Sequence, residues 1–135
     1  MNLYIIFAVL IGHFIGDFVT QKNNHKINRT NNIYHKIKRY LKHLYPHTLI
    51  YSGILSGLLL ILQLFNFLPF ILYINILWFF IITYVSHLLT DLFVTLVVNK
   101  HLLKNKRHKY FVTIGFDQLI HYITLFLTIY FLWYI

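Results

Sequence analysis

Four long apolar stretches restrict the folds open to this chain more than any other feature of its sequence. They run from Leu3 to Val19, from Thr48 to Phe65, from Phe70 to Val98 and from Phe111 to Tyr134. About 20 apolar residues cross the ~30 Å core of a bilayer as an α-helix. Only 11% of the residues are charged, too few to cover the surface of a soluble domain. The sequence predicts an all-α bundle of four transmembrane helices in one domain, residues 1–135, with helices at about 3–20, 47–65, 70–98 and 111–134.

The basic residues predict how this bundle lies in the membrane. All twelve Lys and Arg residues fall in two connections, seven of them within residues 22–42 and five within residues 100–109. Four helices that alternate in direction place these two connections on the same side, and basic loops are retained in the cytoplasm. We expect a multi-pass protein of the cytoplasmic membrane, with cytoplasmic basic loops at 22–46 and 99–110 and both termini outside.

The first basic loop contains an amphipathic pattern. Apolar residues recur at helical spacing, with basic residues on the other faces; the apolar positions are Ile33, Tyr34, Ile37, Tyr40, Leu41 and Leu44. This pattern is typical of a helix that lies on an anionic leaflet, so we expect anionic headgroups at the basic loops. A solvated loop that only enforces orientation is the alternative. Nucleic-acid binding is not expected, because the topology already explains the positive charge.

Two pairs of glycines have the spacing that allows close helix packing. Gly12 and Gly16 lie in the first stretch, and Gly53 and Gly57 lie in the second. The GxxxG spacing lets two backbones approach each other closely in a membrane. A close contact that involves the first two helices is therefore expected.

The three acidic residues are all aspartates, and each lies inside an apolar segment, four positions from a histidine. The pairs are His13 with Asp17, His87 with Asp91, and Asp117 with His121. Residues four apart share one face of an α-helix, so each of three helices presents an imidazole beside a carboxylate. With nine histidines in the chain, chance produces all three pairs with a probability on the order of 0.002.

The three pairs are expected at similar depths in the membrane and would therefore form one layer. Asp91 and Asp117 each lie about seven residues from the cytoplasmic end of their helices, which is roughly 10 Å. His47 begins the second helix, so all four helices can contribute to the layer. Gln21, one turn beyond Asp17, and Gln118, beside Asp117, either hydrogen-bond the ligands or only pack against them. The predicted metal ligands are His13, Asp17, His47, His87, Asp91, Asp117 and His121.

A metal ion explains the charge in this layer. Buried carboxylates are costly within a membrane, and the spans contain no Lys or Arg that would neutralise them. The chain has no cysteine, so the available ligands are nitrogen and oxygen. We expect one or two divalent ions, with Zn²⁺ and Mn²⁺ favoured. The alternative is that the pairs are interhelical hydrogen bonds that only stabilise the bundle.

The motifs also resemble a known family. HFIGDFVTQ at 13–21, His47, HLLTD at 87–91 and DQLIH at 117–121 are similar to the pattern of an uncharacterised family of small bacterial and phage polytopic membrane proteins. That pattern is HxxxDFxxQ, a histidine, HxxxD and DQxxH. The resemblance spans nearly the whole chain and implies a shared site, but the family has no established activity.

Three functions fit these features. The first is a metal-dependent hydrolase for a lipid or lipid-linked phosphate or ester, with Asp17, Asp91 and Asp117 as catalytic residues, one of them a general base. The second is a proton or metal-ion transporter, in which a homo-oligomer would supply the polar residues that a pore needs. The third is a small membrane adaptor whose polar layer is structural.

Overall fold

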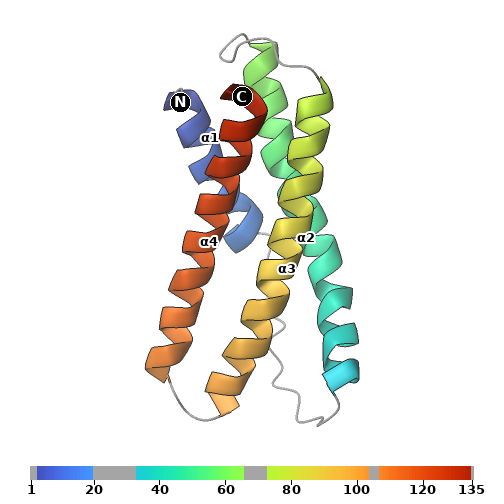
Figure 1. The fold of residues 1–135 in the computed structure, drawn as a ribbon, viewed down its shortest axis with the longest axis vertical. Helices are drawn as coiled ribbons and strands as arrows, with labels where there is room; N and C mark the ends of the chain where they lie inside the picture. The colour runs from blue at the N-terminus through green and yellow to red at the C-terminus, as the bar shows by residue number, and fades with distance from the viewer. Residues whose placement is uncertain (1–2, 20–32, 66–72, 104–106, 135) are drawn as a thin grey trace.

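The computed structural model describes residues 3–19, 33–65, 73–103 and 107–134 (Figure 1). These residues form four α-helices and one π-helical segment, with no strand among them. The elements are α1 (Leu3–Phe14), which continues into η1 (Ile15–Val19), then α2 (Ile33–Leu64), α3 (Tyr73–Leu103) and α4 (Arg107–Tyr134). The predicted all-helical fold is confirmed.

The helices lie side by side with alternating direction. In Figure 1 the first and last described residues are at the same end of the bundle as the end of α2 and the start of α3. Helix α1 and η1 pack against α2, α2 packs against α3, and α3 packs against α4. This arrangement brings one face of every element into a common interior.

Three of the helices are long and apolar enough to cross a membrane. The apolar spans are Tyr40–Leu64, Tyr73–Val97 and Phe111–Trp133, with mean hydropathies of 1.6, 1.8 and 1.4, and Leu3–Asp17 forms a shorter apolar helix. A span of 23 to 25 residues measures about 35 Å at 1.5 Å per residue, which exceeds the hydrocarbon thickness. The chain is therefore a helical membrane protein, whereas the side on which its termini lie stays a prediction.

The distribution of side chains is that of a membrane protein. Large apolar residues such as Phe93, Phe111 and Phe131 are well exposed on the outside of the bundle, whereas His13 and His87 are buried inside it. Lipid tails can cover the apolar exterior, but a buried imidazole must find a partner within the protein. The polar interior is thus the part of the fold that carries specific interactions.

Helix α2 is longer than the predicted second span. It begins at Ile33 and contains Pro46, so the expected amphipathic helix and the span that was expected to start at residue 47 form one continuous helix. Proline removes a single backbone hydrogen bond, and the residues on either side of Pro46 are compatible with a helix. The predicted basic loop at 22–46 is accordingly helical from Ile33 onward, and its earlier residues lie outside the described residues.

The second basic loop is also shorter than predicted, because the helices on both sides extend into it. Helix α3 extends to Leu103 and α4 begins at Arg107, so the predicted loop at 99–110 is mostly helical. Lysine, arginine and leucine are good helix formers, and no glycine or proline interrupts residues 99–110. Apolar patterning marks where a helix enters the membrane and does not mark where the helix ends.

An apolar core fills the half of the bundle that carries the termini. Its buried members come from all four helices and are Ile5, Val9, Tyr51, Leu55, Leu59, Phe79, Leu125 and Ile129. Two glycines let α1 and η1 approach α2 beside this core. A Cβ atom on Gly12 would lie 2.7 Å from Leu55 Cδ2, and one on Gly16 would lie 2.6 Å from Tyr51 Cδ2.

The second glycine pair has a different position. A Cβ atom on Gly53 or Gly57 would meet nothing within 4 Å among the described residues. Of the two GxxxG motifs, only that of the first helix mediates a close contact between α1 and α2.

Candidate metal centre

The bundle gathers the predicted ligands into one buried cluster. His13 comes from α1 and Asp17 from η1; His47 comes from α2, His87 and Asp91 from α3, and Asp117 and His121 from α4. All of them are buried except Asp117, whose side chain is 13% exposed. Gln118 lies in the same cluster, whereas Gln21 lies outside the described residues. A single layer thus contains side chains from every element, as predicted.

Three ligand atoms form a compact triad at the centre. Asp17 Oδ1 lies 3.3 Å from His47 Nε2 and 3.7 Å from His87 Nε2, and the two imidazole nitrogens lie 3.4 Å apart. These three atoms come from η1, α2 and α3, which are far apart in the sequence. They form one of the two groups in the described residues that can hold a metal ion.

The same two imidazoles also face Asp91. Its Oδ2 atom lies 3.3 Å from His87 Nε2 and 3.7 Å from His47 Nε2. Oδ2 is buried and has no hydrogen-bond partner in the described part of the chain. A buried carboxylate oxygen close to two ring nitrogens, yet hydrogen-bonded to neither, has the arrangement of a ligand atom that shares an ion with them.

The spacings agree with metal ligation. Nitrogen and oxygen ligands lie about 2.0–2.2 Å from Zn²⁺, so neighbouring ligands of a tetrahedral ion are about 3.3–3.6 Å apart. The distances in the triad range from 3.3 to 3.7 Å. With neutral imidazoles and ionised carboxylates, a dication would compensate the negative charge that the layer buries.

A second group of ligand atoms adjoins the first. His121 Nε2 lies 3.1 Å from Asp91 Oδ1 and 3.2 Å from Asp117 Oδ1. His87, Asp91 and His121 together form the other group that can hold an ion. His87 belongs to both groups, so the layer can hold one ion or two neighbouring ions.

Ring stacking holds the imidazole of His87. The His87 ring stacks on those of both Tyr51 and His121, with centroid distances of 3.8 and 4.1 Å and interplanar angles of 22° and 24°. His87 Nδ1 is buried and has no hydrogen-bond partner among the described residues. Stacking therefore orients this imidazole. In most metal-binding histidines a hydrogen bond from the second ring nitrogen does so instead.

A directional chain of hydrogen bonds holds Asp17. Gln118 Nε2 donates to Asp17 Oδ2 over 2.8 Å, which turns the amide oxygen of Gln118 toward His13. His13 Nε2 lies 2.8 Å from that oxygen, so it must carry the proton and donate. His13 Nδ1 then accepts from the hydroxyl of Tyr51 over 2.7 Å.

These hydrogen bonds distinguish the residues that can bind a metal from those that orient the ligands. Both ring nitrogens of His13 are engaged by Gln118 and Tyr51, and His13 belongs to neither metal-binding group. One oxygen of Asp17 is held by Gln118, which leaves the other directed at His47 and His87. Partners of this kind fix the orientation of ligating carboxylates.

Tyr51 is the member of the cluster that the sequence analysis did not identify. It donates to His13 and stacks on His87, and it is among the largest fully buried side chains. One signal was present, because Tyr51 follows His47 by four positions and so lies on the same face of α2. A tyrosine in an apolar span is otherwise easily read as a membrane-interface residue.

Comparisons with known proteins found one family that matches the chain. A model of the family DUF3307, described as a protein of unknown function, matches residues 5–135. Neither the curated proteins nor the solved structures contain a match to the chain. The match confirms the resemblance to an uncharacterised family that the motifs suggested. With the family model covering almost all of its length, the chain belongs to the DUF3307 family.

Proposed function

We propose that this protein is a metal-dependent membrane hydrolase that acts on a lipid or lipid-linked ester or phosphate. The observation that carries the proposal is the triad of Asp17 Oδ1, His47 Nε2 and His87 Nε2, with its three mutual distances of 3.3 to 3.7 Å. Three protein ligands are typical of catalytic zinc sites, which keep a fourth position for water or substrate. Bound there, a dication makes water a better nucleophile at neutral pH and polarises the substrate oxygen.

Asp117 has the position of a general base in this scheme. Its side chain is the most exposed of the three aspartates, and it adjoins the centre through His121. Asp117 is also absent from both metal-binding groups, so its carboxylate remains able to accept a proton from water. Asp17 and Asp91 act instead as metal ligands.

The surroundings of the centre support a lipid-derived substrate. Every helix that contributes to the centre is apolar over most of its length, and the exterior of the bundle is covered with large apolar side chains. A substrate that is itself dissolved in the bilayer would approach such a site from the membrane. The net charge of +9 would attract substrates with an anionic headgroup.

Hydrolysis of lipid esters and phosphates by the protein in detergent, with Zn²⁺ or Mn²⁺ supplied, tests the proposal. We expect Asp117→Asn to lower kcat by about 100-fold or more while the bound metal is retained. Asp91→Asn should lose both metal and activity. Thr90→Val is the matched control, because the Thr90 hydroxyl donates only to the Ser86 carbonyl of its own helix among the contacts described.

Full activity of Asp117→Asn would contradict the role given to Asp117. A metal-loaded wild type that hydrolyses none of the lipid esters or phosphates would contradict the proposed reaction. In that case the metal content, measured on the same preparation, would still show whether the centre itself exists.

Transport of a divalent cation is a second candidate, because buried polar side chains continue beyond the centre. Thr48, Ser52, Ser56 and Gln63 are buried along α2. Figure 1 shows that α2 ends at the same end of the bundle as the termini. Thr83 of α3 is also buried, and neither its hydroxyl nor that of Ser56 has a hydrogen-bond partner in the described residues. Unpaired hydroxyls inside a membrane helix bundle can line a polar path.

Uptake of the cation into sealed vesicles distinguishes this candidate. A transporter would accumulate Zn²⁺ or Mn²⁺, Asp91→Asn would abolish uptake, and the double variant Ser56→Ala/Thr83→Val would slow it. A hydrolase would bind the same ion without moving it across the membrane.

A further inference from the structure

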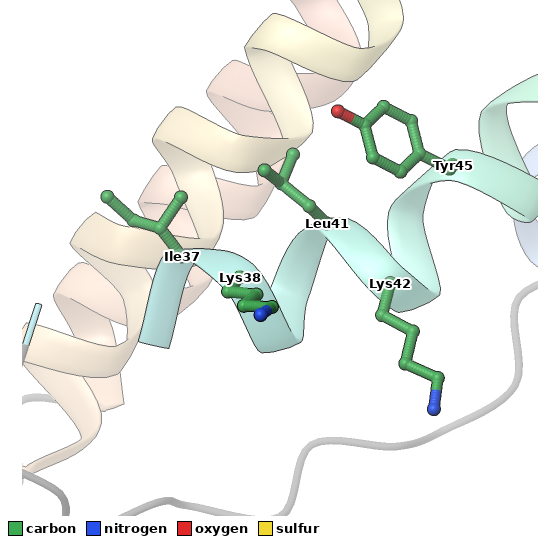
Figure 2. Close-up of a pocket in the computed structure, with 5 residues that line it drawn as sticks. All are labelled: Ile37, Lys38, Leu41, Lys42 and Tyr45. Carbon is green, nitrogen blue, oxygen red and sulfur yellow. The ribbon is translucent and has the colours of Figure 1, made fainter. Parts of the chain in front are cut away.

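A groove beside the first third of α2 lies apart from the metal centre. It has a volume of about 450 Å³ and is lined by Ile37, Lys38, Leu41, Lys42 and Tyr45 (Figure 2). This volume lies within the range of small-molecule binding sites. None of its lining residues belongs to either group of metal ligands.

The groove has an apolar wall beside two cationic groups. Ile37, Leu41 and Tyr45 follow one another at intervals of four residues, and Figure 2 shows them on the side of α2 along which α3 runs. Lys38 and Lys42 are also four residues apart and are exposed, so their ammonium groups lie one turn from each other. Figure 2 shows Lys42 extending to the opposite side from Leu41.

The groove also lies at the membrane boundary. The apolar span of α2 begins at Tyr40, so Ile37 and Lys38 precede the span and Tyr45 lies within it. Lysines at this depth extend their ammonium groups toward the headgroups while their methylene groups cover apolar surface. Helix α2 contains no acidic residue, so no carboxylate of its own helix neutralises Lys38 or Lys42.

We propose that this groove binds an anionic phospholipid of the surrounding membrane. The lipid phosphate lies between the ammonium groups of Lys38 and Lys42, and an acyl chain packs along Ile37, Leu41 and Tyr45. Charge complementarity selects the headgroup, and the apolar wall distinguishes a lipid from a soluble phosphate. The proposal goes beyond the proposed function, because binding requires neither a metal nor a reaction.

The position of the groove relates it to the metal centre. Leu41 and His47 are six residues apart on α2, which is about 9 Å along the helix axis. A lipid in the groove would therefore lie along the helix that supplies a central ligand. Its headgroup would remain at the boundary, about two turns from His47.

Native mass spectrometry of the full chain tests the proposal by counting the lipids that remain bound. We expect wild type to retain one phosphatidylglycerol with a clear preference over phosphatidylcholine. Each basic residue at a membrane surface strengthens the binding of anionic lipid by about fivefold. The double variant Lys38→Gln/Lys42→Gln should therefore weaken phosphatidylglycerol binding by about 30-fold, and Lys38→Arg/Lys42→Arg should restore it.

Lys104→Gln/Lys106→Gln removes the same charge from the 104–106 connection and should bind phosphatidylglycerol as wild type does. Equal losses in the two glutamine variants, or equal retention of the two lipids by wild type, would overturn the proposal. Competition by millimolar inorganic phosphate alone would also overturn it, because it would indicate a soluble anion as the occupant. Metal content is measured on the same samples, so a loss of lipid binding can be distinguished from a loss of metal binding.

Discussion

At the scale of single residues, the centre combines ligands with side chains that orient them. The four-residue spacing predicted contacts within His87–Asp91 and Asp117–His121, and both are present, at 3.3 and 3.2 Å. His13 and Asp17 behave differently, because Asp17 lies in the π-helical η1, where the spacing rule of an α-helix does not hold. His13 is engaged by Tyr51 and Gln118, and Asp17 reaches His47 across the bundle.

Gln118 is the residue whose replacement tests this orientation. Gln118→Leu removes the donor to Asp17 and the acceptor for His13, so we expect metal affinity to fall by about 10- to 100-fold. Competition with a chelator of known affinity measures the change. Thr124→Val is the control on the same helix, because the Thr124 hydroxyl bonds to the Ile120 carbonyl of α4.

An unchanged affinity in Gln118→Leu would show that the hydrogen-bond chain does not hold the ligands. Because Gln118 is part-buried and lies inside the bundle, each variant is compared only when it remains monodisperse in detergent.

The sequence predicted which residues form the centre better than it predicted which of their atoms lie in contact. Histidines and aspartates are rare in apolar spans, so His47, His87 and Asp91 stand out from the sequence alone. Which atom faces which partner depends on the rotation of each helix about its axis. The apolar pattern specifies that rotation poorly, because apolar residues occur around the whole circumference of each span. Tyr51 and the bridging role of Gln118 became evident only once the helices were placed.

At the scale of helices, hydropathy located the spans and misplaced their ends. Helix α2 continues through Pro46 back to Ile33, and α3 continues to Leu103, because basic residues form helix as readily as apolar ones. The π-helical η1 had no signal in the sequence. Such segments occur frequently at functional sites, and here η1 supplies Asp17.

Close packing of η1 on α2 is required to bring Asp17 to its partners. A Cβ atom on Gly16 would lie 2.6 Å from Tyr51 Cδ2 and 3.3 Å from Tyr51 Cα, and a backbone atom cannot give way easily. We expect Gly16→Ala to destabilise the protein by about 1–3 kcal/mol and to weaken metal binding. Thermal unfolding in detergent, with and without added Zn²⁺, measures both effects.

Gly53→Ala is the matched control, since a Cβ atom there meets nothing within 4 Å in the part of the chain that the structure describes. It should leave stability and metal binding unchanged. Equal behaviour of the two alanine variants would contradict the close contact between η1 and α2.

At the scale of the whole molecule, the bundle has an apolar exterior, an apolar core in the half that carries the termini, and a buried polar centre. The two ends of the bundle also differ in charge. The first and last described residues lie at the end opposite the starts of α2 and α4 (Figure 1). All twelve Lys and Arg residues fall within residues 22–42 and 100–109. The positive-inside rule then predicts that the termini lie outside.

Single cysteines test this orientation cleanly, because the chain contains none of its own. Leu3→Cys and Phe65→Cys place exposed thiols at the end with the termini, and Lys38→Cys places one at the opposite end. An impermeant maleimide added to intact cells should label the first two variants and should label Lys38→Cys only after permeabilisation. The reverse pattern would contradict the predicted orientation and leave the fold unchanged.

The central claim is that the buried histidines and aspartates bind a divalent metal, and elemental mass spectrometry of the purified protein tests it most directly. We expect one or two ions of Zn²⁺ or Mn²⁺ per wild-type chain, bound after purification or upon reconstitution. His87→Ala and Asp91→Asn should lose them, because both residues belong to the metal-binding groups, whereas Thr90→Val should keep them. Wild-type protein that binds neither ion after reconstitution would contradict the account and leave the cluster as a hydrogen-bonded layer that stabilises the bundle.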